Sequence, residues 1–351
     1  MKTIVLTGGG TGGHVIPHLS LLPLIKKDFN NIHYIGSENG IEKEIISKHC
    51  EINYHSIPTV KLERKFTFKN FAIPFKLISA INKAKKLLKT IKPNVVFSKG
   101  GFVSVPVVIA AKKLKIPVVS HESDLSMGLA NKIIYKFCNA MCTTFEITAN
   151  DKKRCVFTGS PIRTELFYGN KEKLFRTLPL SRNKKTILFM GGSTGALRLN
   201  EVLYQALPKL TKTYNIIHIV GKGKGNINIK FDSYCQIEFT HNIEDFFAIS
   251  DLIISRAGSN AICEFLALKR PMLLIPLPKN ASRGDQIENA NLFKQLGYAN
   301  VLPQEELSST RLEKEIKLLE ENSSTLINNM KKAKNENGSQ NIYNIIKKYT
   351  N

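Results

Sequence analysis

The amino-acid sequence predicts an α/β protein made of two Rossmann-like domains, each built on a parallel sheet. A strand, a glycine-rich turn and a helix follow one another at the start of the chain, and the same module returns about halfway along it. Apolar strand segments alternate with helical segments, which is typical of βαβ units. The length of 351 residues suits two domains of ordinary size.

The first module begins at the second residue. Residues 2–7 form an apolar strand segment, residues 8–13 contain five glycines and a threonine, and a helix is predicted from His14 to about Lys27. The alternation then continues with strands predicted at residues 32–36, 94–98 and 117–120 and a helix at 103–113. Such alternation predicts parallel strands with helical crossovers.

The second module begins with an apolar strand at residues 185–190, a glycine turn at 191–195 and a helix at 196–209. Further strands are predicted at residues 216–220, 252–255 and 272–276. Glycine and proline at residues 159–161 mark the boundary between the domains. We therefore expect domains at 1–160 and 161–335, and a final helix at 336–351 that packs back on the first domain.

The net charge of +23 predicts attraction to phosphates, nucleic acid or anionic lipid, although a lysine-rich, solvated surface gives the same value. Residues 61–92 hold ten Lys and Arg against Glu63 alone, interleaved with four phenylalanines. We interpret this stretch as a patch that docks on an anionic membrane surface. The alternative is a helix whose aromatic side chains pack inward. No apolar run is long enough to span a bilayer, so we expect no transmembrane helix, and we expect no secretory signal.

The first glycine turn has the spacing Gly8, Gly10 and Gly13, which lets a backbone approach phosphate oxygens at a helix N-terminus. A nicotinamide-dependent dehydrogenase shares this pattern and needs an acid after the second strand, where Glu38 stands. Two features argue against that alternative. His14 directly follows the glycines, and the second half carries its own glycine turn and its own candidate anion-binding segment.

The candidate anion-binding segment of the second half is residues 255–264, where a buried strand turns at Gly258 into a helix. A helix start of this kind binds anions. Glu264 lies one to two turns into the helix, so its carboxylate is placed to accept both hydroxyls of a ribose. A solvent-facing helix acid is the alternative, but the apolar residues that follow Glu264 favour a buried helix.

A metal site is not expected. His14 and His18 are spaced to share one helical face, but Pro17 lies between them and the chain has no Asp-x-Asp pair to bridge a diphosphate. The charge of a departing diphosphate must then be stabilised by helix dipoles and basic groups. We expect no cofactor either.

The chain resembles the MurG family, the N-acetylglucosamine transferases of bacterial peptidoglycan synthesis. The resemblance runs over nearly the whole length and is specific because many motifs occur in order. These motifs are residues 8–14, 98–106, 121–122, 128–132, 159–163, 191–193 and 256–264, Asp285-Gln286 and Asn289-Ala290.

The resemblance implies the glycosyltransferase B fold, with two Rossmann-like domains facing a cleft. It implies transfer of N-acetylglucosamine from UDP-N-acetylglucosamine to the C4 hydroxyl of the muramoyl sugar of lipid I, with inversion, which forms lipid II. The expected partners are these two substrates and an anionic membrane surface, with no nucleic acid. The enzyme is expected at the cytoplasmic face of the cell membrane, bound peripherally.

The resemblance also implies roles for individual residues. The second domain is expected to hold UDP, with Glu264 on the ribose and the backbone near Thr240 on uracil. The remaining donor-binding residues that the resemblance implies are Thr11, Gly12, Gly13, Asp124, Asn131, Arg163, Ser193, Ser259, Asn260, Ala261, Gln286 and Asn289. Two positions depart from the family's commonest form: Asp124 replaces Asn, and Thr194 replaces Gln.

Attack of a hydroxyl on the anomeric carbon needs a base. His14 is the leading candidate, because histidine titrates near neutral pH, and Glu122 is its rival. A purely structural His14 is the third possibility. Three other functions fit the same architecture: a transferase that forms another glycolipid, a UDP-sugar epimerase, and a protein that binds nucleotide without turnover.

Overall fold

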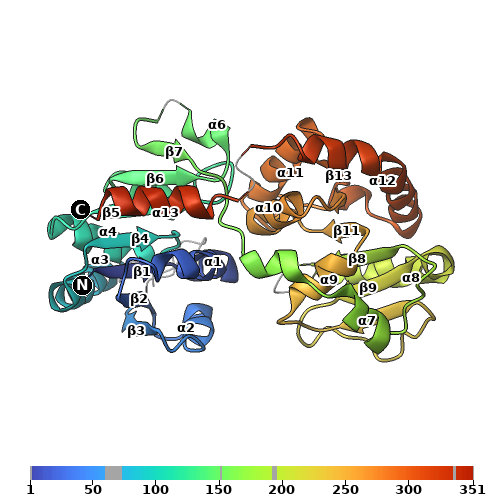
Figure 1. The fold of residues 1–351 in the computed structure, drawn as a ribbon, viewed down its shortest axis with the longest axis horizontal. Coiled ribbons are helices and arrows are strands. Elements are labelled where there is room, and N and C mark those ends of the chain that lie inside the picture. Colours follow the sequence, from blue (N-terminus) through green and yellow to red (C-terminus); the bar gives the residue numbers. More distant parts are fainter. Residues whose placement is uncertain (1, 60–72, 151, 192–195, 335–336, 351) are drawn as a thin grey trace. The chain divides into compact units, whose positions relative to one another are not determined.

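Two parallel sheets organise the chain, one in each of two units (Figure 1). In the computed structural model, unit 1 comprises residues 1–163 with 337–351, and unit 2 comprises 164–336. The chain thus leaves unit 1 after residue 163 rather than 160 and returns to it after residue 336 rather than 335. The structure describes residues 2–59, 73–150, 152–191, 196–334 and 337–350.

The sheet of unit 1 has the strand order β3-β2-β1-β4-β5-β6-β7, and all its pairings are parallel. Its strands are β1 (Thr3–Thr7), β2 (Asn31–Ser37), β3 (Ile52–Ile57), β4 (Val95–Ser98), β5 (Val118–Glu122), β6 (Ala140–Thr143) and β7 (Cys155–Phe157). Every residue of β1 is buried, because helices cover both faces of the sheet. The order reverses between β1 and β4, which is where ligands bind in folds of this kind.

The helices of unit 1 are the short turn η1 (Gly12–His14), α1 (Ile16–Ile25), α2 (Ile41–Ile46), α3 (Ile73–Ile91), α4 (Ser104–Lys113), α5 (Leu129–Tyr135), α6 (Glu146–Ala149) and α13 (Ser339–Lys348). The C-terminal α13 packs beside α1 (Figure 1). Its Ile342, Tyr343 and Ile346 are buried in the same apolar cluster as Ile4 and Leu21. The last residues of the chain therefore complete the core of unit 1.

Unit 2 repeats the arrangement with the strand order β10-β9-β8-β11-β12-β13, again with parallel pairings. Its strands are β8 (Thr186–Met190), β9 (Asn215–Ile219), β10 (Tyr234–Ile237), β11 (Leu252–Ser255), β12 (Met272–Leu274) and β13 (Ala299–Val301). Its helices are η3 (Thr164–Tyr168), α7 (Lys171–Thr177), α8 (Leu197–Thr213), α9 (Ile243–Ile249), α10 (Ser259–Ala267), α11 (Asp285–Gln295), η4 (Gln304–Glu306) and α12 (Ser309–Met330).

The helix predicted from His14 to Lys27 begins later than expected. Residues 12–14 form the 3-10 turn η1, and α1 begins at Ile16, with Pro17 in its first turn. Proline fits there because the first amides of a helix have no intrahelical acceptor. His14 is therefore the last residue of η1 and precedes α1 by one residue, Val15.

The glycine turn after β1 packs against a second glycine turn after β4. Gly101 has a φ of +82°, and a Cβ atom added to it would lie 2.4 Å from the carbonyl oxygen of Gly9. The two backbones approach one another so closely that a side chain on residue 101 would have no room. Glycine is thus required at 101 both by conformation and by contact.

We predict that Gly101→Ala destabilises unit 1, because a left-handed alanine and the clash with Gly9 together cost at least about 1–2 kcal/mol. A thermal unfolding midpoint lowered by at least about 3 °C is expected for a unit of this size. Gly12→Ala is the control, because an added Cβ there meets nothing within 4 Å. Equal midpoints for both variants would show that the contact between the two turns is not tight.

Candidate active site

Three of the sequence motifs meet at the carboxyl edge of the sheet of unit 1. β1 pairs with β4 and β4 pairs with β5, so the segments that follow these strands are neighbours. The segments are the glycine turn at 8–13, residues 99–101 and residues 123–128. The structure thus brings together residues that are more than 110 positions apart in the sequence.

The outer face of the first glycine turn is open. A Cβ atom added to Gly10 or Gly12 would meet nothing within 4 Å, and Thr11 is exposed. His14 is partly exposed, and its Nδ1 lies 3.1 Å from the hydroxyl oxygen of Thr11. Gly13 is also partly exposed. This face therefore offers a ligand the imidazole of His14, the hydroxyl of Thr11 and a backbone that no side chain covers at Gly10 and Gly12.

Glu122, the second candidate base, is buried and fully engaged. Its carboxylate accepts hydrogen bonds from the backbone of Asp124 at 2.9 Å, the backbone of Gly128 at 3.1 Å and the amide of Asn131 at 2.9 Å. Burial, with the nearby Asp124 carboxylate, raises the pKa of Glu122. Its geometry is that of a group that shapes the loop at 123–128.

Asn131 supports the site from within the protein. It is 5% exposed, and its amide donates to Glu122 and, at 3.2 Å, to the carbonyl oxygen of His121. A Cβ atom on Gly100 would lie 2.6 Å from the Asn131 carbonyl oxygen. Asp124, by contrast, is partly exposed. Of these two predicted cleft residues, Asp124 is the one whose side chain reaches the surface.

Lys99 is a residue whose part in this site the sequence did not indicate. It is 1% exposed, and its ammonium donates to Nδ1 of His121 at 2.6 Å and to the hydroxyl of Ser123 at 2.7 Å. His121 in turn donates from Nε2 to the carbonyl oxygen of Gly159 at 3.1 Å. Burial and the Lys99 charge hold the pKa of His121 well below its usual range. The chain of bonds ties three loops of unit 1 together.

In unit 2 the carboxyl ends of the paired strands β11 and β12 lead into α10 and α11. The N-cap residue of α10, Gly258, has no side chain to cap the helix, and among the described residues a Cβ atom added to it would meet nothing within 4 Å. Uncapped amides at the start of a nine-residue helix attract anions. This edge of the second sheet is therefore suited to a phosphate group.

The predicted donor residues of unit 2 surround this helix start. Ser259 is buried, Asn260 and Ala261 are partly exposed, and Glu264 is partly exposed on the next turn of α10. Glu264 belongs to α10 itself, so its carboxylate lies on the same helix as the amides that attract the phosphate.

The two predicted site residues of α11, Gln286 and Asn289, bond to neighbouring loops. Gln286 accepts from the backbone amide of Leu277 at 3.1 Å, and Asn289, fully buried, lies 3.4 Å from the carbonyl oxygen of Ala257. Arg256 joins the same loops, because its guanidinium donates to the carbonyl oxygens of Ile275 and Pro276. The loops after β11 and β12 are thereby fixed to one another.

The remaining predicted residues lie apart from this helix start in sequence. Thr240 follows β10 and accepts from the backbone amide of Asn242 at 3.1 Å. Arg163 is partly exposed at the end of the main segment of unit 1. Ser193 and Thr194 lie outside the described residues.

His18 is fully buried, whereas His14 is partly exposed. The Nε2 of His18 donates to the carbonyl oxygen of Thr7 at 3.2 Å. Burial, with the Lys99 charge, lowers the pKa of His18 to about 3. In the described part of the chain no three His, Cys, Asp or Glu side chains gather as a metal would require.

Buried histidines predict acid lability. Burial lowers the pKa of His18 and of His218 to about 3, whereas both bind a proton below about pH 6.5 when unfolded. The unfolded chain therefore takes up more protons, and stability falls from about pH 6.5 downward by about 1.4 kcal/mol per pH unit for each histidine. Thermal unfolding at pH 7.5 and 5.5 measures this, and His218→Gln should reduce the difference. An unchanged midpoint between the two pH values would contradict it.

Two parallel-sheet units, each with a glycine-bounded turn or helix start at its carboxyl edge, define the architecture of nucleotide-sugar glycosyltransferases, the glycosyltransferase B fold. The models of the glycosyltransferase family 28 N-terminal and C-terminal domains match residues 4–143 and 186–347. The chain therefore belongs to glycosyltransferase family 28.

Individual relatives agree with this assignment. The chain is 48% identical, over 100% of both chains, to the UDP-N-acetylglucosamine–N-acetylmuramyl-(pentapeptide) pyrophosphoryl-undecaprenol N-acetylglucosamine transferase of Clostridium botulinum strain Langeland. The crystal structure of Acinetobacter baumannii MurG has a TM-score of 0.78 at 24% identity and covers 99% of this chain and 100% of its own. These matches confirm the resemblance to the MurG family and the fold that it implies.

The fold alone does not separate transferases from epimerases. The structure of UDP-GlcNAc 2-epimerase from Neisseria meningitidis bound to UDP-GlcNAc has a TM-score of 0.67 at 14% identity, with 99% of each chain covered. The family models and the full-length relative, by contrast, are those of transferases. They favour the transferase over the epimerase.

Proposed function

We propose that the chain transfers N-acetylglucosamine from UDP-N-acetylglucosamine to the C4 hydroxyl of the muramoyl sugar of lipid I and so forms lipid II. The observation that carries the proposal is the full-length, 48% identity to a transferase whose name states this donor sugar and a muramyl-pentapeptide lipid acceptor. The open glycine turn of unit 1 and the uncapped helix start of unit 2 supply the two kinds of contact that the reaction needs.

Unit 2 is proposed to bind the donor. The N-terminus of α10, with Ser259, Asn260 and Ala261, takes the diphosphate, and Glu264 accepts the ribose hydroxyls. The backbone near Thr240 contacts uracil. Gln286 contacts the sugar, supported by the buried Asn289, and Ser193 contacts the phosphates. Arg163, which belongs to unit 1, is proposed to contact the phosphates as well. The helix dipole stabilises the negative charge that develops on the departing UDP.

Unit 1 is proposed to bind the acceptor diphosphate and to supply the base. Thr11, Gly12 and Gly13 lie against the ligands, and Nε2 of His14 takes the proton of the C4 hydroxyl as its oxygen attacks C1 and the bond to UDP breaks. If Nδ1 donates to the Thr11 hydroxyl, Nε2 keeps the lone pair that a base needs. His14 is favoured over Glu122 because the Glu122 carboxylate already accepts three hydrogen bonds.

His14→Ala is expected to lower kcat with UDP-N-acetylglucosamine and a lipid I analogue by about 10²–10⁴-fold, the usual worth of a general base. UDP affinity should stay unchanged, because unit 2 binds the nucleotide in this scheme. Radiolabelled transfer gives kcat, and calorimetry gives UDP affinity. A loss of less than about tenfold would remove His14 as the base.

We further propose that α3 docks on an anionic membrane surface. Its Ala80, Ala84 and Leu88 are buried, whereas Phe75 and Ile78 are 77% and 56% exposed. Exposed lysines flank them at Lys76, Lys83, Lys86 and Lys89. The outward position of Phe75 argues against the alternative in which the aromatic side chains pack inward. The other phenylalanines of the stretch, Phe66, Phe68 and Phe71, lie outside the described residues.

None of the helices in the described part of the chain combines the length and apolar character needed to cross a bilayer. Attachment through α3 would therefore rest on apolar side chains at the interface and on lysine charge.

The double variant Phe75→Ser, Ile78→Ser is expected to weaken binding to phosphatidylglycerol vesicles by at least about tenfold, because each apolar side chain contributes about 1.5–3 kcal/mol when buried. Wild-type binding should also weaken between 50 and 500 mM salt, because added salt shortens the distance over which the lysine charges attract the anionic surface. Ile227→Ser is the matched control, since Ile227 is an equally exposed apolar residue, at 84%, of unit 2. Vesicle binding that is absent, or that neither salt nor the double variant changes, would refute docking through α3.

A further inference from the structure

Glu42 is a fully buried carboxylate in the first turn of α2, and no part of the scheme above uses it. Its neighbours Lys43 and Glu44 in the same helix are exposed. A carboxylate is removed from water at a cost of several kcal/mol unless hydrogen bonds replace its hydration. The partners of Glu42 therefore indicate what it is for.

Those partners belong to two different segments. One carboxylate oxygen accepts from the backbone amide of Ser37 at 3.0 Å and also from the Ser37 hydroxyl, at the end of β2. The other oxygen accepts from the backbone amide of Gly10 at 3.2 Å, in the middle of the first glycine turn. Glu42 thus links the end of β2 to the turn that leads to His14.

The glycines around Glu42 leave room for its carboxylate. A Cβ atom on Gly9 would lie 2.7 Å from the Glu42 carboxyl carbon, and one on Gly40 would lie 2.4 Å from its oxygens. Gly10 itself has a φ of +89°, so its amide is turned toward Glu42 in a conformation that only glycine adopts readily. The turn and the carboxylate are shaped to one another.

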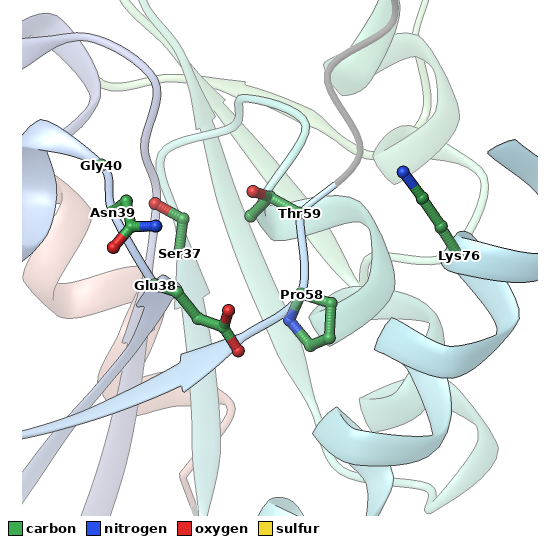
Figure 2. A pocket seen from close by; sticks show the side chains of 7 residues that line it. All are labelled: Ser37, Glu38, Asn39, Gly40, Pro58, Thr59 and Lys76. Carbon is green, nitrogen blue, oxygen red and sulfur yellow. The ribbon is translucent and has the colours of Figure 1, made fainter. Parts of the chain in front are cut away.

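The same carboxylate also holds one wall of an open cavity of about 520 Å³ in unit 1. Ser37 and Gly40, both in contact with Glu42, line it beside Glu38 and Asn39, and Pro58, Thr59 and Lys76 line the opposite side (Figure 2). Glu42 lies behind this wall, between the cavity and the glycine turn.

We infer that Glu42 is a positioning residue: it fixes the glycine turn at 8–13 and so sets where the turn presents its backbone and His14 to the acceptor. The inference rests on the proposed function for its effect on transfer. Its effect on the turn is independent of that function, because it follows from the bond to the Gly10 amide.

Glu42→Gln tests the inference, since it keeps the size of the side chain. The amide replaces one accepting oxygen by a donor, so either Gly10 or Ser37 loses its acceptor. We expect kcat for transfer to a lipid I analogue to fall by about 10–100-fold, as small misplacements of reacting groups do. The KM for UDP-N-acetylglucosamine and the affinity for UDP should change by less than about twofold, since unit 2 is unaltered.

Hydrogen exchange gives a second readout. The peptide that contains Gly10 should exchange faster by about tenfold or more in Glu42→Ala, which removes the acceptors of both Gly10 and Ser37, the equivalent of one lost charge-assisted hydrogen bond at Gly10. Glu44→Gln, on the same helix but exposed, is the matched control and should match the wild type in both measurements. If Glu42→Gln melts near the assay temperature, Glu42→Asp, which keeps the charge but is too short to reach both partners, takes its place.

Either of two results would overturn the inference. One is a Glu42 variant in which both the transfer rate and the exchange at Gly10 equal those of the wild type. The other is a loss of UDP affinity as large as the loss of kcat, because that would indicate a general structural defect. If the wild-type chain transfers no sugar, the proposed function fails, and exchange at Gly10 alone decides whether Glu42 fixes the turn.

Discussion

The parallel pairing of the strands is the constraint on which the rest of the structure depends. Parallel strands all end at the same edge of a sheet, so the segments that follow β1, β4 and β5 must share one small region and satisfy their backbone groups there. The close contact of Gly101 with the carbonyl oxygen of Gly9 is one consequence. At Gly10 and Gly12 the outer face of the turn carries no side chain, so a diphosphate ligand can approach the backbone there.

Buried polar side chains hold these crowded segments in place. Glu42 holds the first glycine turn, Glu122 holds the loop at 123–128, and Lys99 joins that loop to His121. Arg256 does the same in unit 2. Each of these side chains is nearly inaccessible to water and forms its hydrogen bonds with backbone groups or with another side chain. The groups left facing outward, such as His14 and Glu264, are those to which the proposed mechanism assigns contact with substrate.

The sequence predicted the fold because its strongest signals are local. A fully buried strand followed by a glycine turn and a helix is recognisable within about twenty residues, and it occurs twice. The sequence did not predict β3, β6, β7, β10 and β13. Except for β6, these are the edge strands of the two sheets, where fewer residues are fully buried and the apolar signal is weaker. Glu42 was missed because its burial depends on Gly10, 32 positions away, and its own surroundings resemble an exposed helix. Glu122 was weighed as a base because its three internal donors cannot be seen in the sequence.

The central claim is that unit 2 holds the nucleotide and that the glycine turn of unit 1 serves the acceptor. A crystal structure of the chain with UDP measures this directly. The account predicts the diphosphate at the N-terminus of α10 and both ribose hydroxyls within hydrogen-bonding distance of the Glu264 carboxylate. Density for the nucleotide on residues 8–13, with Glu264 remote from any ribose, would contradict it.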